Sequence, residues 1–176
     1  IDVCLFGTGM HDPKSEKKFN LEKVREIMEV NYFGTMNSIN SIYDYFCEKK
    51  NGQISIISSV AGYRGLPAAG AYCASKAALT SFAESLNCDM QMKNVRVSLV
   101  SPGFIKTPMT DQNEFPMPMI KTPEFAANEI YKGLTMKKSF EIHFPKAFTY
   151  FLKFLQILPS SIYFKLVSKG MKKIDY

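Results

Sequence analysis

Tyr72 and Lys76 stand four residues apart in the stretch AYCASKAAL, residues 71–79. If this run is helical, both side chains emerge on one face, because four residues make about one helical turn. An ammonium about 5 Å from a phenol favours the phenolate by roughly 3 kcal/mol at an effective dielectric of about 20, which lowers the pKa of the phenol by roughly two units. The spacing therefore predicts a tyrosine that exchanges a proton near neutral pH.

The same spacing occurs a second time, at Tyr45 and Lys49 in YDYFCEKKNG. A pair of this spacing is expected by chance in a chain this rich in tyrosine and lysine. Lys49 precedes Asn51-Gly52, which is typical of a helix end, so we interpret it as a solvated cation in the last turn. Spacing alone does not distinguish the two pairs, and the surrounding elements must decide between them.

The composition predicts one compact domain, since the chain has 176 residues of which 46% are hydrophobic. The four cysteines are far apart, and no Cys/His cluster suggests a metal site, so we expect reduced thiols and a cytoplasmic protein. The two histidines, His11 and His143, are isolated, and we do not expect either to be a ligand or a catalytic group. The chain has no signal peptide and opens without Met in an apolar strand, IDVCLF, so we expect it to begin inside a longer protein.

The net charge of +6 comes from the end of the chain, where residues 137–176 contain eight lysines but only two acidic residues. This region is also aromatic and apolar, as in FTYFLKFLQILPSSIYFKLVSK, but Pro159 interrupts it and its lysine-free stretch is too short to span a bilayer. Two alternatives remain: helices that pack on the body, or peripheral contact of residues 146–173 with an anionic membrane surface. No motif indicates a nucleic-acid partner.

Strand and helix patterns alternate along the chain. Apolar runs predict strands at 1–6, 52–59, 95–103 and 140–144, and helical patterns cover 21–49, with Asn20 as the N-cap, 70–92 and 122–138. This order predicts an α/β fold with a doubly wound parallel sheet and helices on both faces. The ligand site then lies beyond the carboxyl ends of the strands, where the helix carrying Tyr72 begins and Tyr45 is distant.

Three stretches together resemble the short-chain dehydrogenase/reductase family: ISSVAGYRGLPAAGAYCASKAAL, VNYFGT and SPGFIKTPM. The resemblance covers about residues 1–145 and implies a Rossmann-like fold that binds NAD or NADP. It implies an active site in which Tyr72 is the acid and base, Lys76 its partner and a ribose contact, Ser59 a donor to the substrate oxygen, and Asn31 the holder of a water. The cofactor contacts that it implies are Gly7, Gly9, Tyr72, Lys76, Pro102, Gly103, Ile105 and Thr107.

Two departures from the family pattern concern the cofactor. Phe6-Gly7-Thr8-Gly9 stands where the family usually has Asn-Asn-Ala-Gly, and the glycine-rich phosphate loop is absent. GTGMHD does not replace that loop, because Asp12 occupies the third glycine position and Pro13 follows. We therefore expect residues 1–145 to be the C-terminal two-thirds of the catalytic domain, without its first strands, and residues 146–176 to be a helical extension.

Together the motifs predict an oxidoreductase that transfers a hydride between a nicotinamide and an apolar carbonyl compound or secondary alcohol. The apolar extension resembles the hydroxysteroid-dehydrogenase-like branch of the family, and a homo-oligomer is compatible with the sequence. The alternative is a protein that keeps this fold as a binding or scaffold module without catalysis. The set Asn31, Ser59, Tyr72 and Lys76 argues against the alternative, because a scaffold has no need of these four side chains.

Overall fold

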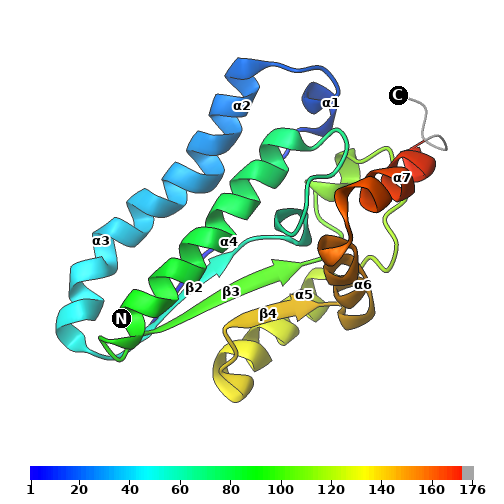
Figure 1. Ribbon diagram of the computed structural model, residues 1–176. Coiled ribbons are helices and arrows are strands. Elements are labelled where there is room, and N and C mark those ends of the chain that lie inside the picture. The colour runs from blue at the N-terminus through cyan, green and yellow to red at the C-terminus, as the bar shows by residue number, and fades with distance from the viewer. Residues whose placement is uncertain (172–176) are drawn as a thin grey trace.

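Four parallel strands form the centre of the molecule (Figure 1). The computed structural model describes residues 1–171, without the side chains of residues 14, 15 and 169–171. The strands are β1 (Val3–Phe6), β2 (Gln53–Ile57), β3 (Arg96–Pro102) and β4 (Glu141–Phe144), and they lie side by side in the order β1-β2-β3-β4. The predicted parallel sheet is confirmed, and each of its strands lies within one of the apolar runs in the sequence.

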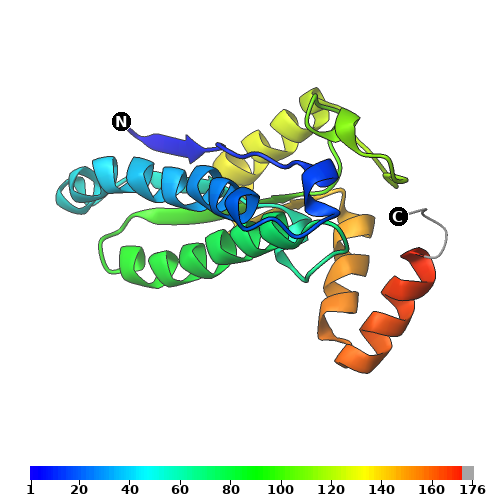
Figure 2. The ribbon, with the colours of Figure 1, turned by 90° about the horizontal axis from the view of Figure 1, so that it is seen from above.

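Helices cover both faces of the sheet, as expected (Figure 2). The helices α2 (Leu21–Met28), α3 (Gly34–Lys49) and α4 (Gly70–Gln91) pack on one face, and α5 (Pro123–Lys132) packs on the other. Asn20 caps α2 as predicted, since its side chain accepts hydrogen bonds from the backbone N–H groups of Glu22 and Lys23. The continuous helix expected over residues 21–49 is wrong in one respect, because a π-helical segment, Glu29–Phe33, separates α2 from α3.

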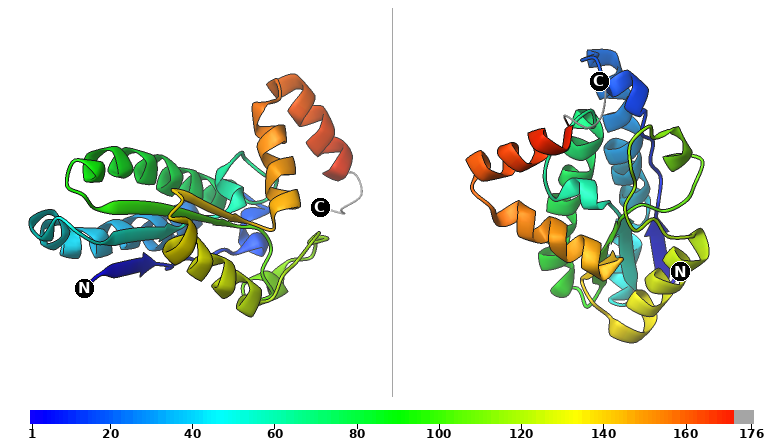
Figure 3. Two further views of the ribbon diagram at one scale, coloured as in Figure 1. Left: turned by 90° about the horizontal axis from the view of Figure 1, so that it is seen from below. Right: turned by 90° about the vertical axis from the view of Figure 1, so that its right-hand side faces the viewer.

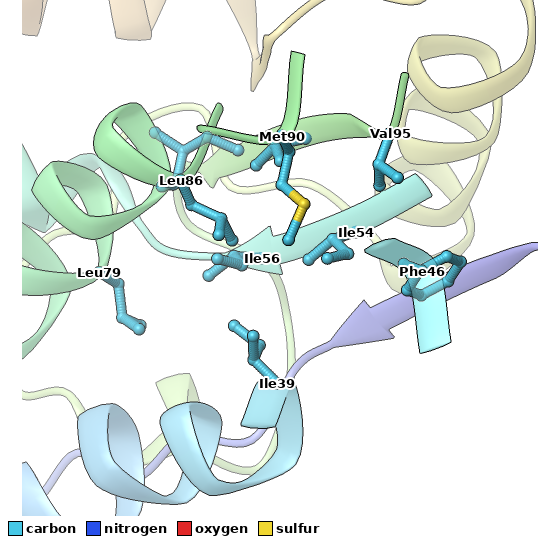
Figure 4. Packing of buried hydrophobic residues seen from close by; sticks show 11 residues of the cluster. Ile39, Phe46, Ile54, Ile56, Leu79, Leu86, Met90 and Val95 are labelled. Atoms are coloured by element: carbon cyan, nitrogen blue, oxygen red, sulfur yellow. The ribbon is translucent and has the colours of Figure 1, made fainter. Parts of the chain in front are cut away.

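The strands alternate their side chains between two apolar clusters. Ile54, Ile56, Val97 and Leu99 point toward α3 and α4, where they meet a cluster that includes Ile39, Phe46, Leu79 and Met90 (Figure 4). Val100, Ile142 and Phe144 point to the opposite face and pack with residues of α5. Burial on both faces explains why the inner strands read as almost continuous apolar runs.

Short helical turns interrupt the loops at the carboxyl ends of the strands. They are α1 (Pro13–Glu16) after β1, the 3-10 turn Val60–Gly62 after β2, and the 3-10 turn Thr110–Gln112 after β3. A second π-helical segment, Gly133–Lys137, ends the helix that was expected over residues 122–138. The first three of these turns give the long loops local order near the carboxyl edge, where the sequence predicts the site.

The C-terminal region forms two helices, α6 (Lys146–Ile157) and α7 (Ser160–Met171), which stand out from the body as a hairpin (Figure 3). One side of α6 packs on the body, where Thr149 is buried and its hydroxyl lies 2.6 Å from Nδ1 of His143. Residues 172–176 of the predicted extension lie outside the described residues. Within residues 1–171, none of the helices has the length and apolar character required to cross a bilayer.

Candidate active site

The four predicted catalytic residues come from three elements that meet at the carboxyl edge of the sheet. Ser59 follows β2 directly and caps the 3-10 turn, since its Oγ accepts a hydrogen bond from the backbone N–H of Ala61 at 3.1 Å. Tyr72 and Lys76 lie in the first two turns of α4, and Asn31 lies in the π-helical segment between α2 and α3. The structure thus brings together residues that are up to 45 positions apart in the sequence.

Lys76 is buried, with 4% of its surface exposed, and its Nζ donates a hydrogen bond to the carbonyl oxygen of Ile57 at 3.2 Å. The Nζ lies 5.7 Å from the centre of the Tyr72 ring. Burial lowers the pKa of Lys76 to about 8, because removal from water disfavours the charged form. A Cβ atom added to Gly9 would lie 3.2 Å from this Nζ, so the loop after β1 covers the ammonium closely.

Tyr72 differs from the sequence-based expectation. Burial raises the pKa of its phenol, and a hydrogen bond with Ser59 acts in the opposite direction. The prediction that the pKa of Tyr72 is lowered is therefore wrong, because burial raises it. The physical reason is desolvation, because removal from water disfavours both the phenolate of Tyr72 and the ammonium of Lys76.

Tyr45 and Lys49 have nearly the same local geometry, with Nζ 5.5 Å from the ring centre, but different surroundings. Tyr45 is 42% exposed. Lys49 donates hydrogen bonds to the carboxylate of Asp2 and to the carbonyl oxygen of Ile1. The interpretation of this second pair as a surface feature is confirmed, and the difference between the two pairs is burial at the sheet edge.

Asn31 is fully buried and holds the loop after β1 against α4. Its Oδ1 accepts a hydrogen bond from the backbone N–H of Met10 at 2.7 Å, and its Nδ2 donates to the carbonyl oxygen of Met10 at 3.0 Å and to Oγ of Ser75 at 2.9 Å. Asn31 lies in a π-helical segment, in which each hydrogen-bonded turn contains one more residue than in an α-helix. Such segments are frequent at functional sites. Asn31 therefore positions the loop after β1, here called the strap, which contains Gly9 and Met10 and covers Lys76. The predicted contact of Asn31 with a water molecule stays a prediction.

Two residues of the site were missed by the sequence analysis, His11 and Glu16. The His11 ring lies 4.4 Å from the Tyr72 ring, centre to centre, and its Nδ1 is 3.1 Å from Oε1 of Glu16. The other oxygen, Oε2 of Glu16, accepts hydrogen bonds from the backbone N–H groups of Ala71 and Tyr72 at 2.8 and 3.3 Å. The carboxylate of Glu16 thus caps the N-terminus of α4 beside Tyr72, where the helix dipole favours a negative charge.

A sequence signal for Glu16 did exist. Ala69 stands at the N-cap position of α4 and provides no side-chain hydrogen bond, where Ser, Thr, Asp or Asn would be usual. An uncapped helix start indicates that a group from elsewhere satisfies its N–H groups. The sequence could not say which carboxylate does so, because Glu16 lies 55 residues from Ala71.

The remaining predicted cofactor contacts lie on two loops. Gly7 follows β1 in an exposed position, and Pro102 ends β3. Gly103 has a clear packing reason to be glycine, because a Cβ there would lie 2.9 Å from Cδ1 of Phe148 in α6. Ile105 pairs with Lys121 in an isolated parallel bridge, and the backbone N–H of Thr107 donates to Oγ1 of Thr110. These loops border the same edge as the four catalytic candidates.

The fold and this arrangement define a Rossmann-like α/β protein with a tyrosine, lysine, serine and asparagine gathered beyond the carboxyl ends of parallel strands. The family model for short chain dehydrogenase matches residues 1–116. The chain belongs to the short-chain dehydrogenase family, whose members named below are oxidoreductases, dehydrogenases or reductases.

Individual relatives agree with this assignment. An uncharacterized oxidoreductase of Myxococcus xanthus is 32% identical over 163 residues, which cover 93% of this chain and 64% of the relative. Dehydrogenase/reductase SDR family member 7B of Mus musculus is 37% identical over 107 residues, which cover 61% of this chain and 33% of the relative. The chain therefore spans between a third and two-thirds of the length of these relatives.

Solved structures show the same fold. A short-chain dehydrogenase from Burkholderia cenocepacia in complex with NADP matches with a TM-score of 0.77 at 24% identity, covering 95% of this chain and 69% of that one. A short-chain dehydrogenase from Streptomyces avermitilis matches with a TM-score of 0.74 at 21% identity, covering 100% of this chain and 71% of that one. At these identities the likeness concerns the fold.

Proposed function

We propose that this chain carries the catalytic part of an NAD(P)-dependent oxidoreductase that interconverts an apolar carbonyl compound and a secondary alcohol. The observation that carries the proposal is the meeting of Tyr72, Lys76 and Ser59 at one sheet edge, with Asn31 holding the strap over them. Membership of an oxidoreductase family supports the reaction class. The substrate class rests on the resemblance and on the apolar loops.

The residues around Lys76 fit the nicotinamide half of such a cofactor. Within the described residues, one carbonyl oxygen, that of Ile57, accepts a hydrogen bond from Nζ, although an ammonium has three donors. Two hydroxyl groups of a ribose would use the remaining donors. Gly9 leaves room for a close approach, because it adds no side chain beside Nζ. The pyrophosphate has no comparable support here, since GTGMHD leads into a helix of four residues.

The proposed mechanism assigns one task to each side chain. A bound nicotinamide supplies or accepts the hydride. Tyr72 donates its phenolic proton to the carbonyl oxygen during reduction and recovers it during oxidation. Ser59 donates a hydrogen bond to the same oxygen as negative charge develops on it. Lys76 holds the ribose and, with a pKa of about 8, keeps its charge at neutral pH beside the phenol.

The same proposal covers the substrate, the cofactor, the location and the oligomeric state of the protein. We propose a small apolar carbonyl compound or alcohol as the substrate, NAD or NADP as the cofactor, the cytoplasm as the location, and self-association into a homo-oligomer. The aromatic side chains near the proposed cofactor loop support an apolar substrate, since Phe104 packs against Phe115 and Phe148 with ring centres 6.0 and 5.6 Å apart.

The test compares the two tyrosines with matched spacing. The complete protein is assayed with NADH and NADPH on apolar ketones and secondary alcohols, and Tyr72→Phe is compared with Tyr45→Phe. Loss of the transferable proton at Tyr72 should reduce kcat by at least about 10²-fold, whereas Tyr45→Phe should leave it unchanged. Equal effects of the two changes, or full activity of Tyr72→Phe, would favour the scaffold alternative.

A further inference from the structure

The hairpin of α6 and α7 exposes an apolar stripe that nothing in the described residues covers. Along α6 the stripe follows helical spacing, with Tyr150, Phe151, Phe154 and Ile157 each between 56% and 78% exposed. In α7, Ile162 and Leu166 share a face at a spacing of four residues and are 47% and 48% exposed, while Phe164 is 62% exposed on another side of the helix. Exposed aromatic and aliphatic side chains gathered on one element indicate a contact surface.

The charged residues of the two hairpin helices all have one sign. Between Glu141 and Asp175 the sequence has no acidic residue, and it has six lysines. Lys146 borders the stripe, with its Nζ 5.9 Å from the centre of the Tyr150 ring, and Lys165 is exposed next to Phe164. Burial lowers the pKa of Lys146, with Lys137 and Lys153 acting in the same direction and Glu141 and Glu129 in the opposite one. The surface is therefore apolar in its centre and cationic at its border.

We propose that the α6–α7 hairpin docks the protein on the surface of an anionic lipid membrane. An interfacial helix places apolar and aromatic side chains among the lipids while its lysines meet the anionic head groups. A second copy of this chain fits the surface less well, because residues 146–171 offer no acidic side chain to pair with Lys146 and Lys165. The proposal goes beyond the proposed reaction and does not depend on it.

Arg64 fixes the hairpin to the rest of the molecule. Its Nη1 donates hydrogen bonds to the carbonyl oxygens of Leu155, Gln156 and Leu158 at 2.9, 3.1 and 2.8 Å, where α6 ends. The guanidinium also lies 3.9 Å from the centre of the Tyr163 ring, whose hydroxyl donates to the carbonyl oxygen of Gly65 at 2.6 Å. These contacts hold the end of α6 and the start of α7 against the loop that contains Arg64 and Gly65.

The same contacts connect the α6–α7 hairpin to the candidate active site. Arg64 and Gly65 belong to the loop between Ser59 and Tyr72, and Phe148 of α6 packs on Gly103 after β3. A docked hairpin therefore holds the carboxyl edge of the sheet close to the lipid surface. An apolar substrate dissolved in the membrane would then have a short path to Tyr72.

The test measures sedimentation of the complete protein with vesicles of phosphatidylcholine, with and without phosphatidylserine. We expect binding to the mixed vesicles and at least about tenfold weaker binding to the neutral ones. Raising the salt from about 0.1 M to about 1 M shortens the screening length from about 10 Å to about 3 Å and should release most of the protein. Absence of binding to the mixed vesicles, or equal binding to both kinds, would overturn the proposal.

Two variants separate the apolar and the charged contributions. Changing Phe151, Phe154 and Ile157 together to Ser should reduce vesicle binding at least about tenfold, with an unchanged circular dichroism spectrum. Changing Lys146 and Lys165 to Gln should reduce the preference for the anionic vesicles and keep the apolar stripe. As matched controls, Met92→Ser and Tyr131→Ser remove apolar groups that are 86% and 62% exposed outside the hairpin, and they should have no effect.

Size-exclusion chromatography with light scattering measures the oligomeric state and tests whether the stripe is instead an interface between two copies of the protein. If the triple Ser variant converts an oligomer into a monomer, the stripe is an interface between copies and the lipid proposal is wrong. If the oligomeric state is unchanged while vesicle binding is lost, the proposal is supported. Neither measurement requires activity, so failure of the proposed reaction would leave this test intact.

Discussion

Replacement of Lys76 by Met should make the protein more stable while it removes activity. Lys76 is 4% exposed, and burial lowers its pKa from 10.5 to about 8. At about 1.4 kcal/mol for each pH unit, the native state carries a cost of about 3 kcal/mol for keeping this ammonium charged at neutral pH. Met has a similar volume and no charge, so it fills the site without that cost.

The hydrogen bond from Lys76 to the carbonyl oxygen of Ile57 reduces the expected gain. A bond of this kind contributes about 1 kcal/mol, so the net increase in the free energy of unfolding at pH 7 should be about 2 kcal/mol. For a chain of 176 residues this corresponds to an increase in Tm of about 4 to 8 °C. A catalytic residue that lowers stability in this way is common, because active sites retain groups that the fold alone would not favour.

The pH dependence provides an independent check of the sign. Between pH values of about 8 and 10.5 the native state has released the Lys76 proton while the unfolded chain still binds it. The stability of the natural protein therefore gains a contribution from Lys76 as the pH rises through this window, and the Met variant lacks that contribution. The advantage of the Met variant should shrink steadily from pH 8 to pH 10.5.

The assay is urea unfolding followed by far-ultraviolet circular dichroism at pH 7 and pH 10. Lys49→Met is the matched control, because Lys49 has the same spacing from a tyrosine but lies at the surface in an ion pair with Asp2. We expect this control to lose a little stability or to remain unchanged, since exposed ion pairs contribute little. A Lys76→Met protein that is no more stable than the natural one at pH 7, or whose advantage is the same at pH 10, would refute the reasoning.

Four further predictions concern the site and its supports. Ser59→Ala should lower kcat by about 10²-fold to 10³-fold through loss of one donor to the developing oxyanion, with circular dichroism unchanged; an effect on KM alone would contradict this role. Glu16→Gln should reduce the free energy of unfolding in urea by about 1 kcal/mol by weakening the charge at the start of α4, whereas Glu124→Gln at the exposed start of α5 should have a smaller effect; equal effects would argue against a special role of Glu16. Gly103→Ala should destabilise the protein by about 1 to 3 kcal/mol because its Cβ would meet the Phe148 ring at 2.9 Å, while Gly65→Ala has open space and should be neutral in thermal unfolding. Residues 1–176 alone should bind NADH and NADPH poorly in calorimetric titration, because among the described residues β1 leads only into the four-residue helix α1, which is too short to hold a pyrophosphate at its N-terminus; micromolar binding would show that the phosphate site lies within this chain.

The amino-acid sequence by itself determined the order of the main strands and helices, and it predicted four candidate site residues that the fold brings to one sheet edge. The strands and helices could be predicted because apolar spacing and the Asn20 cap act within a few residues along the chain. The sheet edge could be predicted because the carboxyl ends of parallel strands meet at one side, and this rule also separated Tyr72 from Tyr45. These features depend on short-range chemistry or on a general rule of topology.

Only the tertiary structure decided what surrounds these residues. Glu16 reaches Ala71 across 55 positions, and Arg64 reaches Leu155 across 91, so neither contact leaves a local pattern in the sequence. The direction of the pKa shift at Tyr72 also depended on the fold, because desolvation is set by all the side chains that exclude water from the phenol. Spacing alone determines which groups lie near each other on a helix, whereas burial determines how strongly they hold their protons.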